Sequence, residues 1–192
     1  MRRGIRFQAP FAAALLGLAV VAVLPGRARA EVAVFGHGTA QECYQAALAG
    51  RSDPAALHLC DLALQLDDLI PEDRGGTFIN RGVMKLRQRR LDAALADLDA
   101  GVKLNPAAGD GWLDHGAVLT ALGRYGEGLA ELNKSLALGV SQPEKAYFNR
   151  AIAEEGQGDE TSAYFDYQKA LALRPGWDLP KKELTRFTVT RK

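Results

Sequence analysis

The chain has 192 residues, of which 47% are hydrophobic and 24% are charged, a composition typical of one ordinary globular domain. Its formal net charge is +1, but the first 30 residues contribute five arginines and no acidic residue. Removing those arginines from the 24 basic residues leaves 19 against 23 acidic ones, a net charge of −4. A mildly acidic chain lacks the basic surface that nucleic-acid binding requires, so we expect no nucleic-acid partner.

Residues 1–30 have the pattern of a secretory signal peptide. Arg2, Arg3 and Arg6 precede an uncharged apolar run over residues 11–24, and residues 28–30 read Ala-Arg-Ala, a small-x-small cleavage site. The apolar run is shorter than the roughly 20 residues that a membrane span needs. We therefore expect cleavage after Ala30, no membrane span in the mature chain, and a location in the periplasm or outside the cell. An uncleaved N-terminal anchor is the alternative, and the choice between Sec and Tat export stays open.

The only two cysteines are Cys43 and Cys60. In an oxidising compartment an even pair is first interpreted as a disulfide. Two neighbouring antiparallel helices bring Cα atoms within the roughly 7 Å that a disulfide allows. Two buried free thiols are the alternative.

The stretch from Phe78 to Pro106 predicts two short helices joined by a turn, and it recurs along the chain. Gly116 lies 34 residues after Gly82, and Ala151 lies 35 residues after Gly116. Self-similarity at this period is typical of a solenoid, in which each unit buries its apolar face against its neighbours.

This periodicity divides the chain into segments. A flexible lead-in is expected over 31–39, followed by a degenerate first hairpin over 40–74 whose last part, from Asp67 to Arg74, forms a long linker. Three complete units are expected over 75–106, 109–140 and 144–175. Residues 176–192 form a capping helix and tail, because the terminal repeat of a solenoid needs a cover with a polar outer face.

These units resemble the tetratricopeptide repeat. The family has an aromatic residue at position 4, a small residue at position 8 and further small and large positions on the second helix. The matching residues at positions 4 and 8 are Phe78 and Gly82, Trp112 and Gly116, and Tyr147 and Ala151. The resemblance implies an all-α, right-handed superhelical solenoid of helix hairpins with a C-terminal capping helix. It carries less information about function than about fold.

Two positions depart from the family pattern, because charged residues recur there. Position 7 carries Arg81, His115 and Arg150, and position 23 carries Asp97, Glu131 and Asp166. We predict a structural ion pair between the two helices of each unit, since arginine binds carboxylates in a bidentate manner. Independent exposed charges, each contributing less than roughly 1 kcal/mol, are the alternative.

The family's partners usually lie along the concave surface made by the first helices. The matching positions predict an apolar groove with a few charges at its edges, which would suit an extended or helical peptide. Its residues are Ile79, Val83, Leu86, Arg87, Leu113, Ala117, Thr120, Lys145, Phe148, Ile152 and Glu155. The alternative is that these side chains are covered by the chain itself. Asn80 and Asn149 could belong to a clamp for a partner's C-terminal carboxylate, but apolar residues at position 5 argue against one.

The sequence offers no catalytic motif, and we expect no enzymatic activity, no cofactor and no metal. Asp110 and Asp114 share one helical face beside His115, but the preference of acidic residues for helix N-termini explains Asp110 equally well. The function predicted is a non-enzymatic interaction module or assembly scaffold in the cell envelope that binds a peptide or protein partner. The alternative is a periplasmic holdase that binds unfolded exported chains. The partner's identity, the pathway and the oligomeric state are not predicted, and self-association is compatible with the pattern.

Overall fold

The structure is a computed structural model that describes residues 38–187. Over this range the chain forms helices and no strand. The helices are α1 (Thr39–Leu48), α2 (Pro54–Leu66), α3 (Pro71–Arg87), α4 (Leu91–Leu104), α5 (Gly109–Ala121), α6 (Tyr125–Leu138), α7 (Pro143–Gly156), α8 (Glu160–Leu173) and α9 (Asp178–Leu184). The expected signal peptide, residues 31–37 of the expected lead-in and residues 188–192 of the expected tail lie outside the described residues, and Thr39 already belongs to α1.

Local signals set several of the helix starts. The Asp53 carboxylate accepts a hydrogen bond from the Ala56 backbone N–H at 3.1 Å, and Pro54 occupies the first helical position of α2. The Asp159 carboxylate caps α8 in the same way by accepting from the Ser162 N–H at 3.0 Å. Both caps satisfy backbone donors that have no partner within the helix.

The expected linker from Asp67 to Arg74 is wrong in its second half. Helix α3 begins at Pro71, so only residues 67–70 separate it from α2. Pro71 is pre-organised for the first helical position, and the negative charges of Glu72 and Asp73 favour the N-terminal end of the helix dipole.

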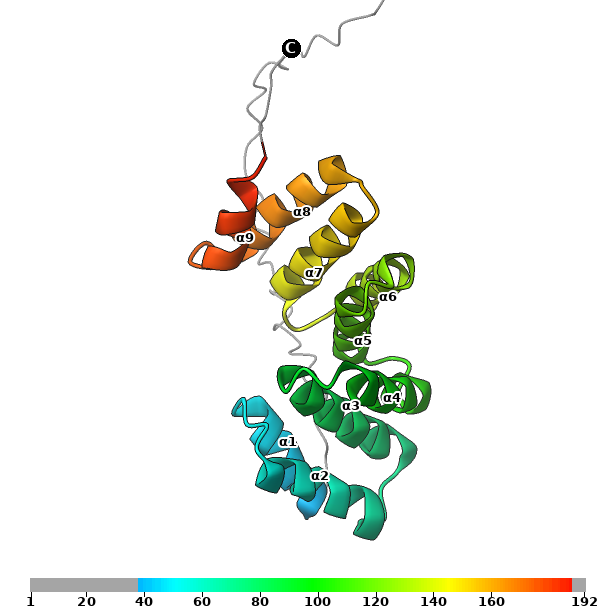
Figure 1. Ribbon diagram of the computed structural model, residues 1–192. Helices are drawn as coiled ribbons and strands as arrows, with labels where there is room; N and C mark the ends of the chain where they lie inside the picture. Colours follow the sequence, from blue (N-terminus) through cyan, green and yellow to red (C-terminus); the bar gives the residue numbers. More distant parts are fainter. Residues whose placement is uncertain (1–37, 188–192) are drawn as a thin grey trace, which may run out of the picture.

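Four helix hairpins stack into a curved array, as Figure 1 shows from α1/α2 in blue and cyan to α7/α8 in yellow and orange. The first helices of successive hairpins contact one another, α1 with α3, α3 with α5 and α5 with α7. Each second helix contacts the first helix of the next hairpin, as α4 contacts α5 and α6 contacts α7. The first helices therefore form one continuous surface, which is the concave face.

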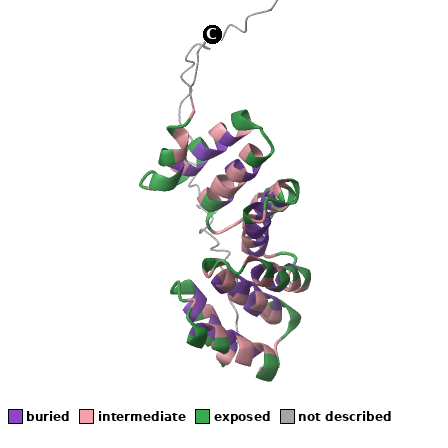
Figure 2. Ribbon diagram, viewed as in Figure 1, coloured by how far each residue is buried: buried purple, intermediate pink, exposed green. Residues whose placement is uncertain are grey.

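The core lies between the helices of each hairpin, and the turns are exposed (Figure 2). Close approach depends on residues that have little or no side chain at the crossing. A Cβ atom on Gly82 would lie 2.8 Å from Cγ of Leu98, and one on Gly116 would lie 2.8 Å from Cγ of Leu132. Both leucines are fully buried. The small residue of one helix thus provides the space that the leucine of the other fills.

Helix α9 packs against α8 and closes the last hairpin. Leu184 and Phe187 pack against a buried cluster that contains Ala151, Ala163 and Tyr167. Within the part of the chain that the structure describes, no helix is both long enough and apolar enough to cross a bilayer.

Substituting Gly116→Ala should lower the free energy of unfolding by roughly 1–3 kcal/mol, because the added methyl group must displace Leu132. Gly126→Ala in α6 is the matched control, since its Cβ would meet only the flexible end of the Gln157 side chain at 3.1 Å. This control should be neutral or stabilising, as alanine favours the helix. Urea unfolding followed by circular dichroism measures both. Equal effects of the two substitutions would contradict the packing described here.

Candidate functional site: a cavity on the concave face

A cavity of about 160 Å³ lies on the concave face where α1, α3 and α5 meet the start of α7. Its apolar part includes Ile79 and Leu113, which are 3% and 5% exposed. Its polar residues come from three places along the chain: Asn80 and Arg87 from α3, Asp110 and Asp114 from α5, and Ser141, Gln142 and Lys145 from the segment that starts α7. Tyr44, Ala47 and Leu48 of α1 complete the wall.

Five residues of the predicted groove line this cavity. They are Ile79, Val83, Arg87, Leu113 and Lys145.

The other predicted groove residues do not line the cavity. Thr120 is buried, and its hydroxyl donates to the Gly116 carbonyl at 2.8 Å. Leu86 packs beside the core cluster of α3, α4 and α5, and Ile152 packs beside that of α7 and α8. Ala117 lies outside the cavity.

The C-terminal part of the predicted groove is occupied by the chain itself. The Phe148 ring lies 4.8 Å from the Trp177 ring, centroid to centroid. The Glu155 carboxylate accepts from the Tyr167 hydroxyl at 2.6 Å and from the Arg186 guanidinium at 2.7 Å. Position within the repeat predicted exposure here, but the residues around α9 add neighbours that a repeat pattern does not include.

Asn80 is the most unusual polar residue of the cavity. It is only 9% exposed, and its side-chain nitrogen Nδ2 is fully buried with no hydrogen-bond partner in the described part of the chain. A buried donor without a partner costs about 1–3 kcal/mol. An acceptor supplied by a ligand would remove this cost.

Asp110 and Asp114 follow each other by one helical turn on α5. The Oδ1 atom of Asp110 accepts from both the backbone N–H and the hydroxyl of Ser141, each at 2.9 Å, which joins α5 to the segment before α7. His115, which the sequence placed beside the two aspartates, does not line the cavity. The three residues therefore do not form one site.

The pKa of Asp114 is raised from 3.8 to about 7. Burial is the largest cause and the negative charge of Asp110 is the second, and both outweigh the lowering effects of Lys145 and Arg87. Burial and a like charge both disfavour the ionised carboxylate. A group in a cleft whose pKa is strongly shifted is a candidate for ligand binding.

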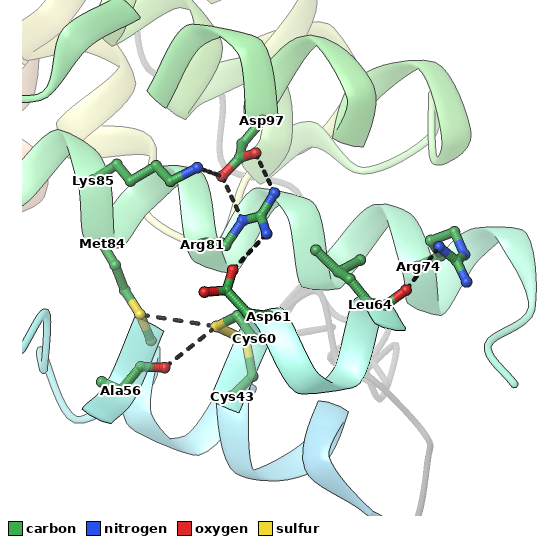
Figure 3. A network of polar contacts seen from close by, with 10 residues as sticks. All are labelled: Cys43, Ala56, Cys60, Asp61, Leu64, Arg74, Arg81, Met84, Lys85 and Asp97. Carbon is green, nitrogen blue, oxygen red and sulfur yellow. Dashed lines mark hydrogen bonds and ion pairs between the residues drawn. A yellow bond between two sulfur atoms is a disulfide. The ribbon is translucent and has the colours of Figure 1, made fainter. Parts of the chain in front are cut away.

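The disulfide between Cys43 and Cys60 joins α1 to α2 with a Cα–Cα distance of 4.8 Å. Both residues are fully buried, and the sulfur atom of Met84 on α3 lies 3.9 Å from that of Cys60 (Figure 3). The Arg87 guanidinium also donates to the Ala47 carbonyl at 2.9 Å. These contacts fasten α1, which forms one wall of the cavity, to the rest of the stack.

The structure brings together two of the three predicted ion pairs with bidentate geometry. Arg81 donates to both carboxylate oxygens of Asp97 at 2.7 and 2.8 Å, and Arg150 donates to those of Asp166 at 2.6 and 2.9 Å. Lys85 adds a second ion pair to Asp97 at 2.6 Å (Figure 3).

The third predicted pair is present only as a long contact. His115 Nδ1 lies 3.9 Å from Glu131, within ion-pair distance but without a hydrogen bond, whereas its Nε2 lies 2.8 Å from Asp99 on α4. An imidazole is shorter than a guanidinium and cannot contact both helices with two donors each.

The cations also reach the preceding hairpin, which the sequence analysis missed. Arg81 contacts Asp61 on α2 at 2.6 Å, and Arg150 contacts Asn133 on α6 at 2.7 Å. The contact of His115 with Asp99 on α4 follows the same pattern. Asp99 and Asn133 are 34 residues apart, so the repeat period itself was the signal.

Residues 144–176 match the sequence model of the tetratricopeptide repeat. A comparison with curated proteins finds no match. Among solved structures, the tetratricopeptide domain of Arabidopsis OM64 is similar with a TM-score of 0.56 and 20% identity, over 59% of this chain and 93% of that one. A MamA RS-1 ArsTM double mutant has a TM-score of 0.60 and 20% identity, over 77% and 82% of the two chains.

YrrB, described as a tetratricopeptide protein with an unusual peptide-binding site, has a TM-score of 0.53 and 17% identity, over 74% of this chain and 88% of its own. One repeat of the chain thus matches the tetratricopeptide family model, and the fold is shared with these solved tetratricopeptide structures. Its architecture is accordingly an all-α solenoid of helix hairpins. Among the described residues, no three side chains of the metal-binding types gather into a candidate metal site.

Substituting Asp114→Asn should stabilise the protein at pH 8 and change its stability much less at pH 4. An acid whose folded-state pKa is raised loses its proton first in the unfolded chain, so the free energy of unfolding falls as pH rises from about 4 to about 7. The neutral amide avoids this loss, and we expect a gain of roughly 1–3 kcal/mol at pH 8. Thermal and urea unfolding at the two pH values measure it. A gain of the same size at both would show that Asp114 is not the titrating group.

Proposed function

We propose that this protein is a non-enzymatic interaction module that binds an extended segment of a partner protein in the cavity between α1, α3, α5 and α7. The buried Asn80 amide is the observation that carries the proposal, because it is a donor without an acceptor on the concave face. A peptide backbone offers carbonyl oxygens at regular intervals and can supply that acceptor.

The size and lining of the cavity support a peptide side chain rather than a cofactor. Sites for drug-sized ligands usually measure about 300–1,000 Å³, whereas this cavity measures about 160 Å³. Leu48 stands at its edge and is 57% exposed, which offers apolar contact beside the polar groups. The description of YrrB as a tetratricopeptide protein with a peptide-binding site supports this proposal.

We further propose that the protein works in the cell envelope. The pattern of residues 1–30 supports export, and a buried disulfide between α1 and α2 is suited to an oxidising compartment. Expressing the full sequence and determining the N-terminus of the purified protein by mass spectrometry tests the export step, with Glu31 as the expected first residue.

The binding function is tested by affinity capture from a cell-envelope extract, using the protein expressed from its full sequence as bait. Leu48→Arg places a long charged side chain at the cavity edge, and Leu179→Arg on α9 is the matched control because Leu179 is 50% exposed and far along the chain. We expect a stoichiometric partner with wild type and the control, and loss of that partner with Leu48→Arg. Circular dichroism checks that all three are folded.

Two other results would change the conclusion. Many unrelated unfolded chains captured by wild type would favour the periplasmic holdase over a selective scaffold. A partner that Leu48→Arg retains would move the binding surface away from the cavity.

A further inference from the structure

The inner part of the cavity is negative, and its rim is positive. Asp114 is strongly desolvated, and the charge that acts on it most is that of Asp110, ahead of Lys145 and Arg87. Lys145 and Arg87 are both exposed residues, and the Arg87 guanidinium is already hydrogen-bonded to the Ala47 carbonyl. A ligand anion that entered the cavity would therefore meet two carboxylates, whereas a cation would be attracted by both.

Asp114 has room for a partner. Among the described residues it forms no hydrogen bond or ion pair, although it lines the cavity and is partly exposed there. Asp110, one turn earlier, is oriented by its two hydrogen bonds from Ser141. A cation beside Asp114 would offset the repulsion between the two carboxylates.

Asn80 gives a second, independent observation. Its Nδ2 donor is more than nine-tenths buried, has no acceptor in the described part of the chain, and belongs to the same cavity lining. A simple metal cation would satisfy the carboxylates but would leave this donor without an acceptor. A peptide segment carries both a cationic side chain and backbone carbonyls, and it satisfies both requirements.

We propose that the cavity receives one lysine or arginine side chain of the partner segment, which pairs with Asp114 beside Asp110 while the Asn80 amide donates to a backbone carbonyl of that segment. The apolar surface of Ile79 and Leu113 contacts the methylene groups of the inserted side chain. This inference rests on the proposed function and specifies the chemistry of the partner.

The test uses four pools of peptides of about nine residues, the length of an extended binding segment. The central residue is lysine, arginine, norleucine or glutamate, the flanks are randomised over alanine, serine and leucine, and both termini are blocked. The pools are offered together to the immobilised protein, and bound peptides are quantified by mass spectrometry. We expect lysine and arginine peptides to bind about tenfold more tightly than norleucine ones, the effect of one charge-assisted hydrogen bond.

Three variants assign the effect to residues. Asp114→Asn should remove the preference for lysine and arginine, whereas Asp92→Asn, an exposed aspartate on α4, should keep it. Asn80→Ala should weaken the binding of lysine and norleucine peptides by the same factor, because the Asn80 amide contacts the peptide backbone and not the central side chain. Circular dichroism shows that each variant is folded.

The pH dependence gives a further readout. A selected lysine peptide should bind several-fold more tightly at pH 8 than at pH 6, because the Asp114 carboxyl has a pKa of about 7 and is mostly ionised at pH 8. The charged groups that act on Asp114 are Asp110, Lys145 and Arg87. Tyr44 of α1 lines the same cavity. A norleucine peptide should show no such change.

The outcomes separate the two proposals. If norleucine or glutamate peptides bind as tightly as lysine peptides, the cavity does not select a basic side chain, although the protein still binds peptides. Retention of no peptide at all would overturn both. A lysine preference that Asp114→Asn preserves would place the cation elsewhere and overturn the assignment of the site.

Discussion

Two of the three complete hairpins depend on an arginine on the first helix that bridges two second helices. Arg81 connects α4 with α2, and Arg150 connects α8 with α6 through side-chain contacts of 2.6–2.9 Å. A guanidinium fixes direction because its donors form a rigid planar fork. The bridge therefore holds the paired helices together and also sets the orientation of one hairpin on the previous one. Helices α3 and α7, which carry these arginines, line the cavity together with α1 and α5.

The first hairpin has no such cation, and a covalent bond occupies the equivalent place. Cys43 stands at the position where later units carry Arg81, His115 and Arg150, and it is bonded to Cys60 on the second helix. Among the described residues this short hairpin packs against one neighbouring unit, and the disulfide holds its two helices together. Because α1 supplies one wall of the cavity, the stability of this hairpin and the shape of the cavity are linked.

The sequence was sufficient for the hairpins and for the arginine pairs, because each depends on residues within one repeat. It failed where contacts depend on other parts of the chain. His115 pairs mainly with Asp99 of the preceding hairpin, and Phe148 and Glu155 are contacted by Trp177 and Arg186 after the last repeat. The cavity joins residues from Tyr44 to Lys145, so only the stacked structure brings them together. The spacing of Asp110 and Asp114 was a visible signal, but its significance required Asn80 on a different helix.

We propose that a partner segment binds in the concave cavity and contacts Asn80 there. The most direct measurement is the nuclear magnetic resonance signal of the Asn80 side-chain amide, assigned by its loss in Asn80→Ala, during titration with a segment of the captured partner. The Nδ2 protons should shift downfield as they gain an acceptor, together with signals from α3 and α5. Shifts confined to the turn at residues 88–90 or to α4 and α6, with the Asn80 amide unchanged, would place the binding surface outside the cavity.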